Sequence, residues 1–141
     1  MAKTPRLQHW FDEVWNHANE HSIENLLHSE AIVHGLGTDT DKTGHEAFKP
    51  FYKNFRASFP LVHVELKPIF DTDEFEAADC IVTVTNAGGK QARFTGIVIS
   101  RFKDGKLIEH WGFMEIQSVI KMMQPTRATN AIVDSLRKNP N

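Results

Sequence analysis

The sequence predicts an α+β fold, in which helices gather on one face of an antiparallel sheet. Two observations lead to this class. Apolar residues recur at helical spacing as far as Phe59, and after Pro60 they alternate with polar residues, as they do in strands. The chain has 141 residues, which suits one domain of ordinary size. The helices are therefore expected to pack on one sheet, and a strongly curved sheet would leave a pocket between the two layers.

The first two helices are predicted near the N-terminus. Thr4 is a suitable N-cap with Pro5 at the first helical position, and Ser22 is a suitable N-cap for a second, shorter helix. Between them an apolar stripe runs at helical spacing over about four turns. It consists of Leu7, Trp10, Phe11, Val14, Trp15 and Ala18. The spacing predicts one continuous helix that buries these side chains against the sheet.

A third helix is predicted after a short strand at residues 31–34 and a turn-rich segment. Thr43 and Glu46 have the spacing of a capping box, and Pro60 ends the helix. The apolar stripe of this helix consists of Phe48, Phe51, Tyr52, Phe55 and Phe59. Like the first stripe, it is expected to face the sheet.

Four antiparallel strands are predicted in the second half of the chain. The first alternates Val62, Val64 and Leu66 with polar residues, and the others cover residues 81–85, 91–102 and 107–116. Gly96 is expected to mark a bulge or bend. The acidic residues between the first two strands are predicted to form a solvated connection: Asp71, Asp73, Glu74, Glu76 and Asp79.

Composition excludes several classes of function. The formal net charge is −2 and the basic residues are scattered, so no face for binding nucleic acid is expected. The longest apolar run, residues 96–100, is far shorter than the roughly 20 residues of a membrane helix, so no membrane association is expected. The N-terminus has no apolar signal region, which predicts a cytoplasmic location. The one cysteine, Cys80, excludes an internal disulfide and is expected to be buried.

Three segments of the chain resemble SnoaL-like polyketide cyclases. They are Gly44-His45-Glu46-Ala47-Phe48, Ser58-Phe59-Pro60, and the run from Arg101 through Asp104-Gly105-Lys106 to Glu109-His110-Trp111. The resemblance extends from Trp10 to Gln124. It implies the cone-shaped α+β barrel of the nuclear transport factor 2 and ketosteroid isomerase superfamily, with three helices packed on a strongly curved antiparallel sheet. We therefore expect a SnoaL-like domain at residues 1–124 and a C-terminal tail at residues 125–141.

The resemblance also implies a catalytic carboxylate. In the cyclases a carboxylate four residues after the last-strand Trp acts as general acid/base, and this position is Glu115, where the family typically has Asp. Its apolar neighbours in the sequence would raise the carboxyl pKa by desolvation, as proton transfer near neutral pH requires. The alternative is a carboxylate that points to water or caps the following helix. A second, polar family position falls on Arg101, which could pair with Glu115 or hold a ligand oxygen, or lie on the surface.

The aromatic residues suggest a ligand pocket, since ten Phe and three Trp are present against one Tyr. Its candidate walls, for a flat and largely apolar ligand, are Trp15, Tyr52, Phe55 and Trp111. His34 is a candidate partner for a substrate oxygen, with a bond to loop backbone as the alternative. If Trp111 faces the pocket, strand parity turns His110 away from it. His17 and His21 have helical metal-ligand spacing, but no third ligand is evident, so no metal and no cofactor are expected.

Three functions remain as hypotheses. The first is a cofactor-free cyclase or isomerase that uses Glu115 as the base on an aromatic or polycyclic carbonyl substrate. The second is an epoxide-hydrolase-type hydrolase, which needs two inward acids near Arg101. The third is a non-catalytic domain that binds a small ligand or dimerises. Members of the superfamily commonly form homodimers through the open face of the sheet, where Ile97 and Ile99 or Val98 would lie.

Overall fold

The computed structural model describes residues 2–34 and 43–114, and it confirms the α+β class. Helical elements occupy most of the N-terminal half of the chain, and long strands occupy the C-terminal half. The elements in chain order are α1 (Pro5–Trp10), the π-helix η1 (Phe11–Asn16), α2 (His21–Leu26), β1 (Leu27–Val33), α3 (Gly44–Ser58), β2 (Leu61–Asp71), β3 (Phe75–Thr85), β4 (Gln91–Lys103) and β5 (Lys106–Met114).

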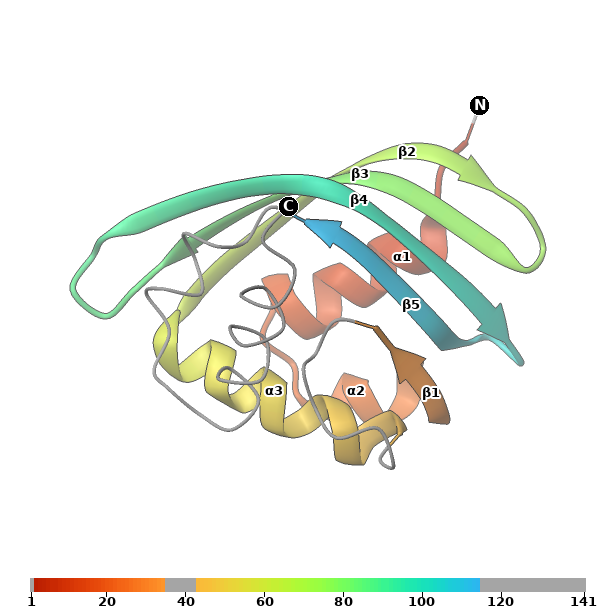
Figure 1. Cartoon of the computed structure of the whole chain (residues 1–141), viewed down its shortest axis with the longest axis horizontal. Helices are drawn as coiled ribbons and strands as arrows, with labels where there is room; N and C mark the ends of the chain where they lie inside the picture. The colour runs from red at the N-terminus through yellow and green to blue at the C-terminus, as the bar shows by residue number, and fades with distance from the viewer. Residues whose placement is uncertain (1, 35–42, 115–141) are drawn as a thin grey trace, which may run out of the picture.

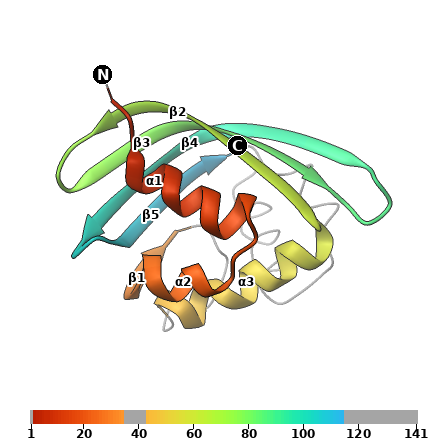
Figure 2. The same cartoon turned by 180° about the vertical axis from the view of Figure 1, so that it is seen from behind.

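The five strands form one sheet in the order β1-β5-β4-β3-β2. β2 to β5 are antiparallel neighbours, whereas β1 pairs with β5 in parallel, so the sheet is mixed rather than purely antiparallel. Figures 1 and 2 show β2, β3 and β4 bent into an arch, with α1 beneath its concave side and α3 further from the sheet. The curvature that the sequence suggested is therefore present.

The concave face of the sheet carries the core. Along β2 the buried residues alternate with exposed ones, as the period of two predicted. The buried strand residues meet the apolar stripes of the helices and include Val62, Val64, Cys80, Val82, Phe94 and Val98. We call this the inner face of the sheet and the opposite side the outer face.

The first helix differs from the prediction in its internal geometry. Its apolar stripe is buried as far as Trp15, but the helix ends at Asn16, and Ala18 is exposed with a positive φ of 53°. After Trp10 the backbone changes to π-helical bonding, in which the N–H of His17 donates to the Asp12 carbonyl five residues earlier at 2.7 Å. A run of apolar residues at helical spacing does not reveal this change of register.

The helix caps predicted from local sequence are confirmed in position at Thr4 and Thr43, which are the N-cap residues of α1 and α3, but not in their side-chain bonds. The Thr4, Thr43 and Ser22 side chains make no capping bond at a helix N-terminus: Thr4 has φ 42°, the capping box does not form, and Ser22 lies inside α2. Gly44, at the start of α3, has φ +57° and lies against the backbone of Ser29. A Cβ at this position would lie 2.1 Å from the Ser29 carbonyl oxygen, so the close contact between α3 and β1 requires glycine.

The acidic segment is solvated as predicted at Asp71, Asp73, Glu74 and Asp79, which are exposed, but not at Glu76. β3 begins at Phe75, and Glu76 is only 1% exposed. The Glu76 carboxylate accepts hydrogen bonds from the backbone N–H groups of Arg6 and Leu7, at 3.0 Å each, and from the Arg6 side chain. Asp71, its cross-strand neighbour, accepts from the N–H groups of Lys3 and Thr4. These two carboxylates cap α1 from a distant part of the chain.

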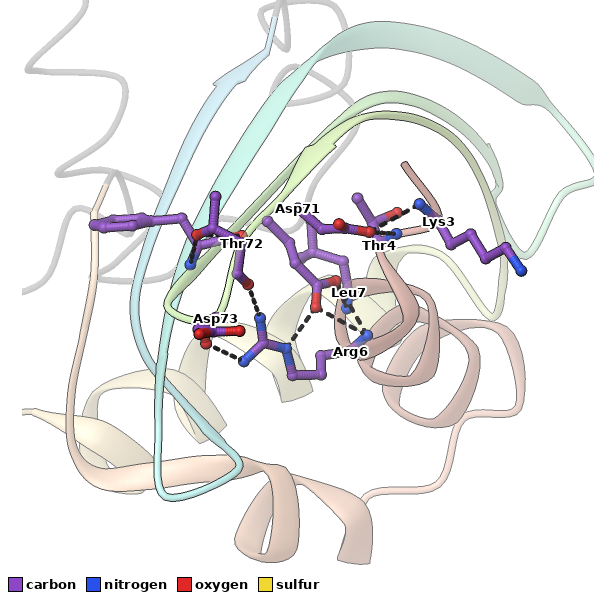
Figure 3. A network of polar contacts seen from close by, with 9 residues as sticks. Lys3, Thr4, Arg6, Leu7, Asp71, Thr72 and Asp73 are labelled. Carbon is purple, nitrogen blue, oxygen red and sulfur yellow. Dashed lines mark hydrogen bonds and ion pairs between the residues drawn. The ribbon is translucent and has the colours of Figure 1, made fainter. Parts of the chain in front are cut away.

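We call the group formed by Arg6, Asp71, Glu76 and the hairpin carbonyls of Thr72 and Asp73 the N-terminal clasp (Figure 3). The Arg6 guanidinium donates to the Asp73 carbonyl at 2.9 Å and to the Thr72 carbonyl at 2.8 Å. Negative charge at a helix N-terminus is stabilised by the helix dipole and by the unpaired N–H groups there. The clasp therefore holds the start of α1 on the β2–β3 hairpin and fixes the direction in which α1 crosses the sheet.

Gly96 marks no bulge, because it pairs in register with Cys80 on one side and Met114 on the other. The β4–β5 ladder is instead irregular near its turn. There Phe102 pairs with Leu107, and Arg101 pairs with Glu109, which leaves Ile108 as an extra residue in β5. This bulge reverses which side chains of β5 face the helices.

Candidate functional site

A cavity of about 190 Å³ lies between the inner face of the sheet and the helices. Its wall is mostly apolar. Side chains from α1, η1 and α3 form the aromatic part, namely Trp10, Phe11, Trp15, Phe48, Phe51 and Phe55. β2, β3 and β4 contribute Phe94 and smaller residues, including Val64, Val82 and Cys80. Burial raises the pKa of the Cys80 thiol to about 12, so this thiol is neutral in the wall.

The aromatic part of the wall is held by ring contacts between η1 and α3. The Trp15 ring meets the rings of Phe48 and Phe55 edge-on, with centroids 6.2 and 5.3 Å apart. Such edge-to-face contacts add stability beyond simple burial. Trp15 and Phe55, both predicted as pocket walls, line the cavity; we propose below that they contact the ligand.

Tyr52 does not line the cavity as the sequence suggested. Its hydroxyl donates a hydrogen bond of 2.6 Å to the carbonyl of Val14 in η1, and its ring packs behind Trp15 with centroids 4.9 Å apart. Burial raises the pKa of the phenol. The π-helical segment explains why Tyr52 finds an acceptor there. The N–H of Asn19 donates to the Glu13 carbonyl, and the neighbouring Val14 carbonyl accepts from Tyr52. Tyr52 therefore supports the cavity wall from outside.

The bulge at Ile108 turns His110 toward the cavity and Trp111 away from it. Without the bulge the tight turn would pair Ser100 with Glu109, whereas in the structure Ser100 pairs with His110. Both Ser100 and His110 are inward, and His110 lines the cavity together with Gly112. The parity argument, which turned His110 away by placing Trp111 in the pocket, is therefore wrong.

His110 is the histidine whose ring is held inside the wall. Its Nδ1 lies 2.6 Å from the Oγ of Ser100, a residue with no exposed surface, and its ring lies 6.2 Å from that of Phe11. Desolvation among these residues lowers the pKa of His110 to about 4. The imidazole is therefore neutral at pH 7, and a neutral imidazole offers one donor and one acceptor.

The other predicted polar residues meet on the outer face of the sheet. Glu109 accepts a hydrogen bond from Arg101 at 3.3 Å and lies 2.8 Å from His34 Nε2. The His34 ring stacks on Trp111 with centroids 5.2 Å apart, and Arg101 also lies 3.8 Å from Glu74. The bond from His34, and then the one from Arg101, lowers the pKa of Glu109.

This outer-face network separates the predicted site residues. Arg101 and Trp111 are absent from the cavity wall that the structure describes. His34 reaches the wall at the end of β1, but its ring is bonded to Glu109 and stacked on Trp111. Glu115 and the tail at residues 125–141 lie outside the described residues. Within residues 2–34 and 43–114, no carboxylate lines the cavity, and no group of three metal-ligating side chains occurs.

His110 is the residue that sequence reasoning missed. Its signal was weak but present. Along β4 the polar Arg93 and Arg101 fall on one parity, so Ser100 on the other parity belongs to the inner face. A small polar residue among inward apolar ones indicates a polar partner opposite it.

The described helices include none that is long and apolar enough to cross a membrane.

The fold matches solved structures of related proteins. IdmH from Streptomyces antibioticus, described as a candidate polyketide cyclase, has a TM-score of 0.64 and 21% identity, over 79% of this chain and 91% of that chain. A candidate polyketide cyclase from Bacillus cereus has a TM-score of 0.69 and 24% identity, over 83% and 76%. AclR from Streptomyces galilaeus, described as a candidate hydroxylase, has a TM-score of 0.65 and 18% identity, over 83% and 94%.

These identities support the fold alone, which agrees with the cone-shaped α+β barrel that the sequence implied. No protein of curated function matches the chain. The model of the SnoaL-like polyketide cyclase family, however, matches residues 5–121, which include the helices, all five strands and the cavity wall. The chain therefore belongs to the SnoaL-like polyketide cyclase family.

Proposed function

We propose that the protein binds a small, uncharged ring ketone in the cavity and acts on it as a cofactor-free cyclase or isomerase. The observation that carries this proposal is the composition of the wall, which is aromatic and aliphatic except for Gly112, the neutral Cys80 thiol and the rings of His34 and His110. Apolar surface contributes about 25 cal/mol for each Å² removed from water, so an apolar wall favours an apolar ring system.

The size of the cavity narrows the ligand class. An apolar cavity of about 150 Å³ can hold benzene. The cavity here, of about 190 Å³, is somewhat larger and open to the outside. One ring or two fused rings therefore fit, and any further part of a polycyclic substrate would extend through the opening. Trp15 and Phe55 would contact the enclosed rings.

The proposed chemistry is proton transfer at a carbon next to a carbonyl group. Glu115, at the position where the family has its catalytic carboxylate, would take the proton, and the electron pair would move onto the carbonyl oxygen as an enolate. Return of the proton from Glu115 to another carbon of the conjugated enolate completes an isomerisation. In an aldol cyclisation the enolate carbon attacks a second carbonyl of the same molecule, and the resulting alkoxide takes the proton back from Glu115.

The test is hydrogen–deuterium exchange at the α-carbon of 1-indanone in heavy water, followed by proton NMR. We expect the wild type to accelerate exchange and Glu115→Gln to lower the enzyme-dependent rate by about 10²-fold or more. Glu65→Gln is the matched control, since Glu65 is exposed on the outer side of β2. Exchange at the wild-type rate in Glu115→Gln would contradict the assignment of the base.

A second candidate is a non-catalytic binding domain. It is favoured by the lack of a carboxylate in the described part of the cavity wall. The same experiment separates the two, because a binding domain takes up 1-indanone without accelerating exchange. The hydrolase hypothesis loses its support, since Arg101 and its acidic partners Glu109 and Glu74 lie together on the outer face.

We also propose that the protein forms a homodimer through the outer face of the sheet. Ile97 and Phe113 are cross-strand neighbours there and are 41% and 64% exposed. Large apolar side chains that lie exposed beside each other on one face favour a surface that contacts another protein chain. Sedimentation velocity is expected to show a dimer at micromolar concentration and a monomer for Ile97→Lys. A monomeric wild type would refute the dimer.

A further inference from the structure

We propose that His110, oriented by Ser100, is the recognition group for the ligand's carbonyl oxygen and donates a hydrogen bond to it from Nε2. The inference rests on the proposed function, because it names the polar contact that the apolar cavity offers. It goes further by assigning the direction of that contact. The site would then take a hydrogen-bond acceptor without charge.

The two nitrogens of the His110 imidazole differ in their hydrogen bonding. Nδ1 is bonded to Ser100 Oγ at 2.6 Å, whereas Nε2 has no hydrogen-bond partner among the described residues. His110 lines the cavity. In the part of the chain that the structure describes, neither of its ring nitrogens is both fully buried and without a hydrogen-bond partner. Nε2 is therefore the ring nitrogen that a ligand in the cavity can reach.

Ser100 determines which nitrogen carries the hydrogen. Its side chain has no exposed surface, and its Oγ bonds to no other group than His110 among the described residues. If Nδ1 were the donor, the serine hydrogen would have no acceptor, and a buried unpaired donor costs about 1–3 kcal/mol. The hydroxyl therefore donates to Nδ1. In a neutral imidazole the hydrogen then lies on Nε2.

The groups that face His110 keep this arrangement uncharged. Desolvation, and to a smaller extent the neighbouring His34, lower its pKa to about 4. From β3 the titratable groups are the neutral Cys80 thiol in the wall and the Glu76 carboxylate, which pairs across the strands with Ser100 and has both oxygens bonded in the N-terminal clasp. From η1 the neighbour is the apolar ring of Phe11. An anionic ligand would lose its hydration here without meeting a full positive charge. A ketone oxygen loses little hydration free energy in the cavity and gains one hydrogen bond.

The experiment compares 1-indanone with indane, which has the same rings without the oxygen. Binding to the wild type, His110→Phe and Ser100→Ala is followed by quenching of tryptophan fluorescence, since Trp10 and Trp15 line the cavity. His63→Gln is the matched control, because His63 is exposed on β2. The quantity of interest is the ratio of the two dissociation constants, in which changes in packing largely cancel.

We expect the preference for 1-indanone over indane to fall about 3- to 10-fold in His110→Phe relative to the wild type. Ser100→Ala should show a smaller fall, and His63→Gln should keep the wild-type ratio. In the wild type, the infrared carbonyl stretch of bound ¹³C-labelled 1-indanone should shift to lower frequency, and Ser100→Ala should reduce this shift. A merely structural role of Ser100 would not move the band.

The outcomes separate the inference from the proposed function. If both probes bind with the same ratio in all variants, or the carbonyl band does not shift, the cavity binds rings but His110 is not the recognition group. If neither probe binds the wild type, the proposed function fails and the inference fails with it. Tight binding of indane-1-carboxylate at pH 7, in preference to 1-indanone, would also overturn the assignment of a neutral donor.

Discussion

Glu76 of the N-terminal clasp and the His110–Ser100 pair are polar groups on the same inner face of the sheet, and they differ in how completely they are bonded. Glu76 accepts from two backbone N–H groups and from the Arg6 side chain, so both carboxylate oxygens are bonded within the protein. His110 is bonded on one nitrogen. A fully bonded buried group has no capacity left for a ligand and serves the fold. A group bonded on one side holds its orientation and keeps a contact for a ligand.

The largest expected effect comes from breaking the clasp. Glu76→Ala would remove the carboxylate partner of the Arg6 guanidinium, which keeps its bonds to the Thr72 and Asp73 carbonyls, and would leave two N–H groups of α1 uncapped. A buried donor that loses its acceptor costs about 1–3 kcal/mol, so the loss of the acceptor for two such N–H groups is expected to cost about 2–4 kcal/mol. Urea denaturation followed by circular dichroism should show a loss of this size. Glu74→Ala is the control and should change the free energy of unfolding by less than about 0.5 kcal/mol, because Glu74 is on the surface.

The second effect is a dependence of stability on pH that comes from His110. Its pKa is about 4 in the folded protein against 6.5 ordinarily, so the unfolded chain takes up a proton first as the pH falls. His110 therefore does not lower the free energy of unfolding above about pH 6.5. Between that value and about pH 4 the free energy of unfolding falls by about 3 kcal/mol.

The measurement is the free energy of unfolding of the wild type and of His110→Gln between pH 4 and pH 7. The variant should lack the part of the slope that lies between pH 6.5 and pH 4.5. Glu109, whose carboxyl pKa is lowered by His34 and Arg101, contributes only below that window. Equal slopes in both proteins would mean that His110 is not desolvated.

A smaller effect is expected for Tyr52→Phe. The variant removes the hydrogen bond to the Val14 carbonyl and should cost about 1–2 kcal/mol of stability. Because the hydroxyl points to η1 and not to the cavity, the ratio of 1-indanone to indane binding should stay at the wild-type value. A fall in that ratio would show that Tyr52 contacts the ligand after all.

What could be predicted from the sequence depended on local periodicity. The apolar stripes of Trp10, Trp15 and Phe55 predicted buried helix faces, and the alternation along β2 predicted one buried strand face, because side-chain direction repeats within each element. The turn at residues 103–106 was predicted as well, and Asp104 and Gly105 both have the positive φ values that it requires.

The parts that could not be predicted depend on residues far apart in the chain or on one extra residue in a strand. Glu76 caps α1 across about 70 positions, so no local pattern distinguishes it from a solvated acid. The bulge at Ile108 shifts β5 by one residue, and a shift of one residue exchanges every side chain between the two faces. With this exchange His110 faces the cavity and Trp111 lies on the outer face, the reverse of the arrangement expected from the sequence.

The most direct test of the account is the ¹⁵N NMR spectrum of the His110 side chain, recorded at pH 7 with and without 1-indanone. The account predicts a neutral ring with its hydrogen on Nε2 in the free protein, and a change in the Nε2 signal when the ketone binds, with Nδ1 nearly unchanged. A hydrogen on Nδ1, a charged ring, or an Nε2 signal that does not respond to bound ketone would contradict it.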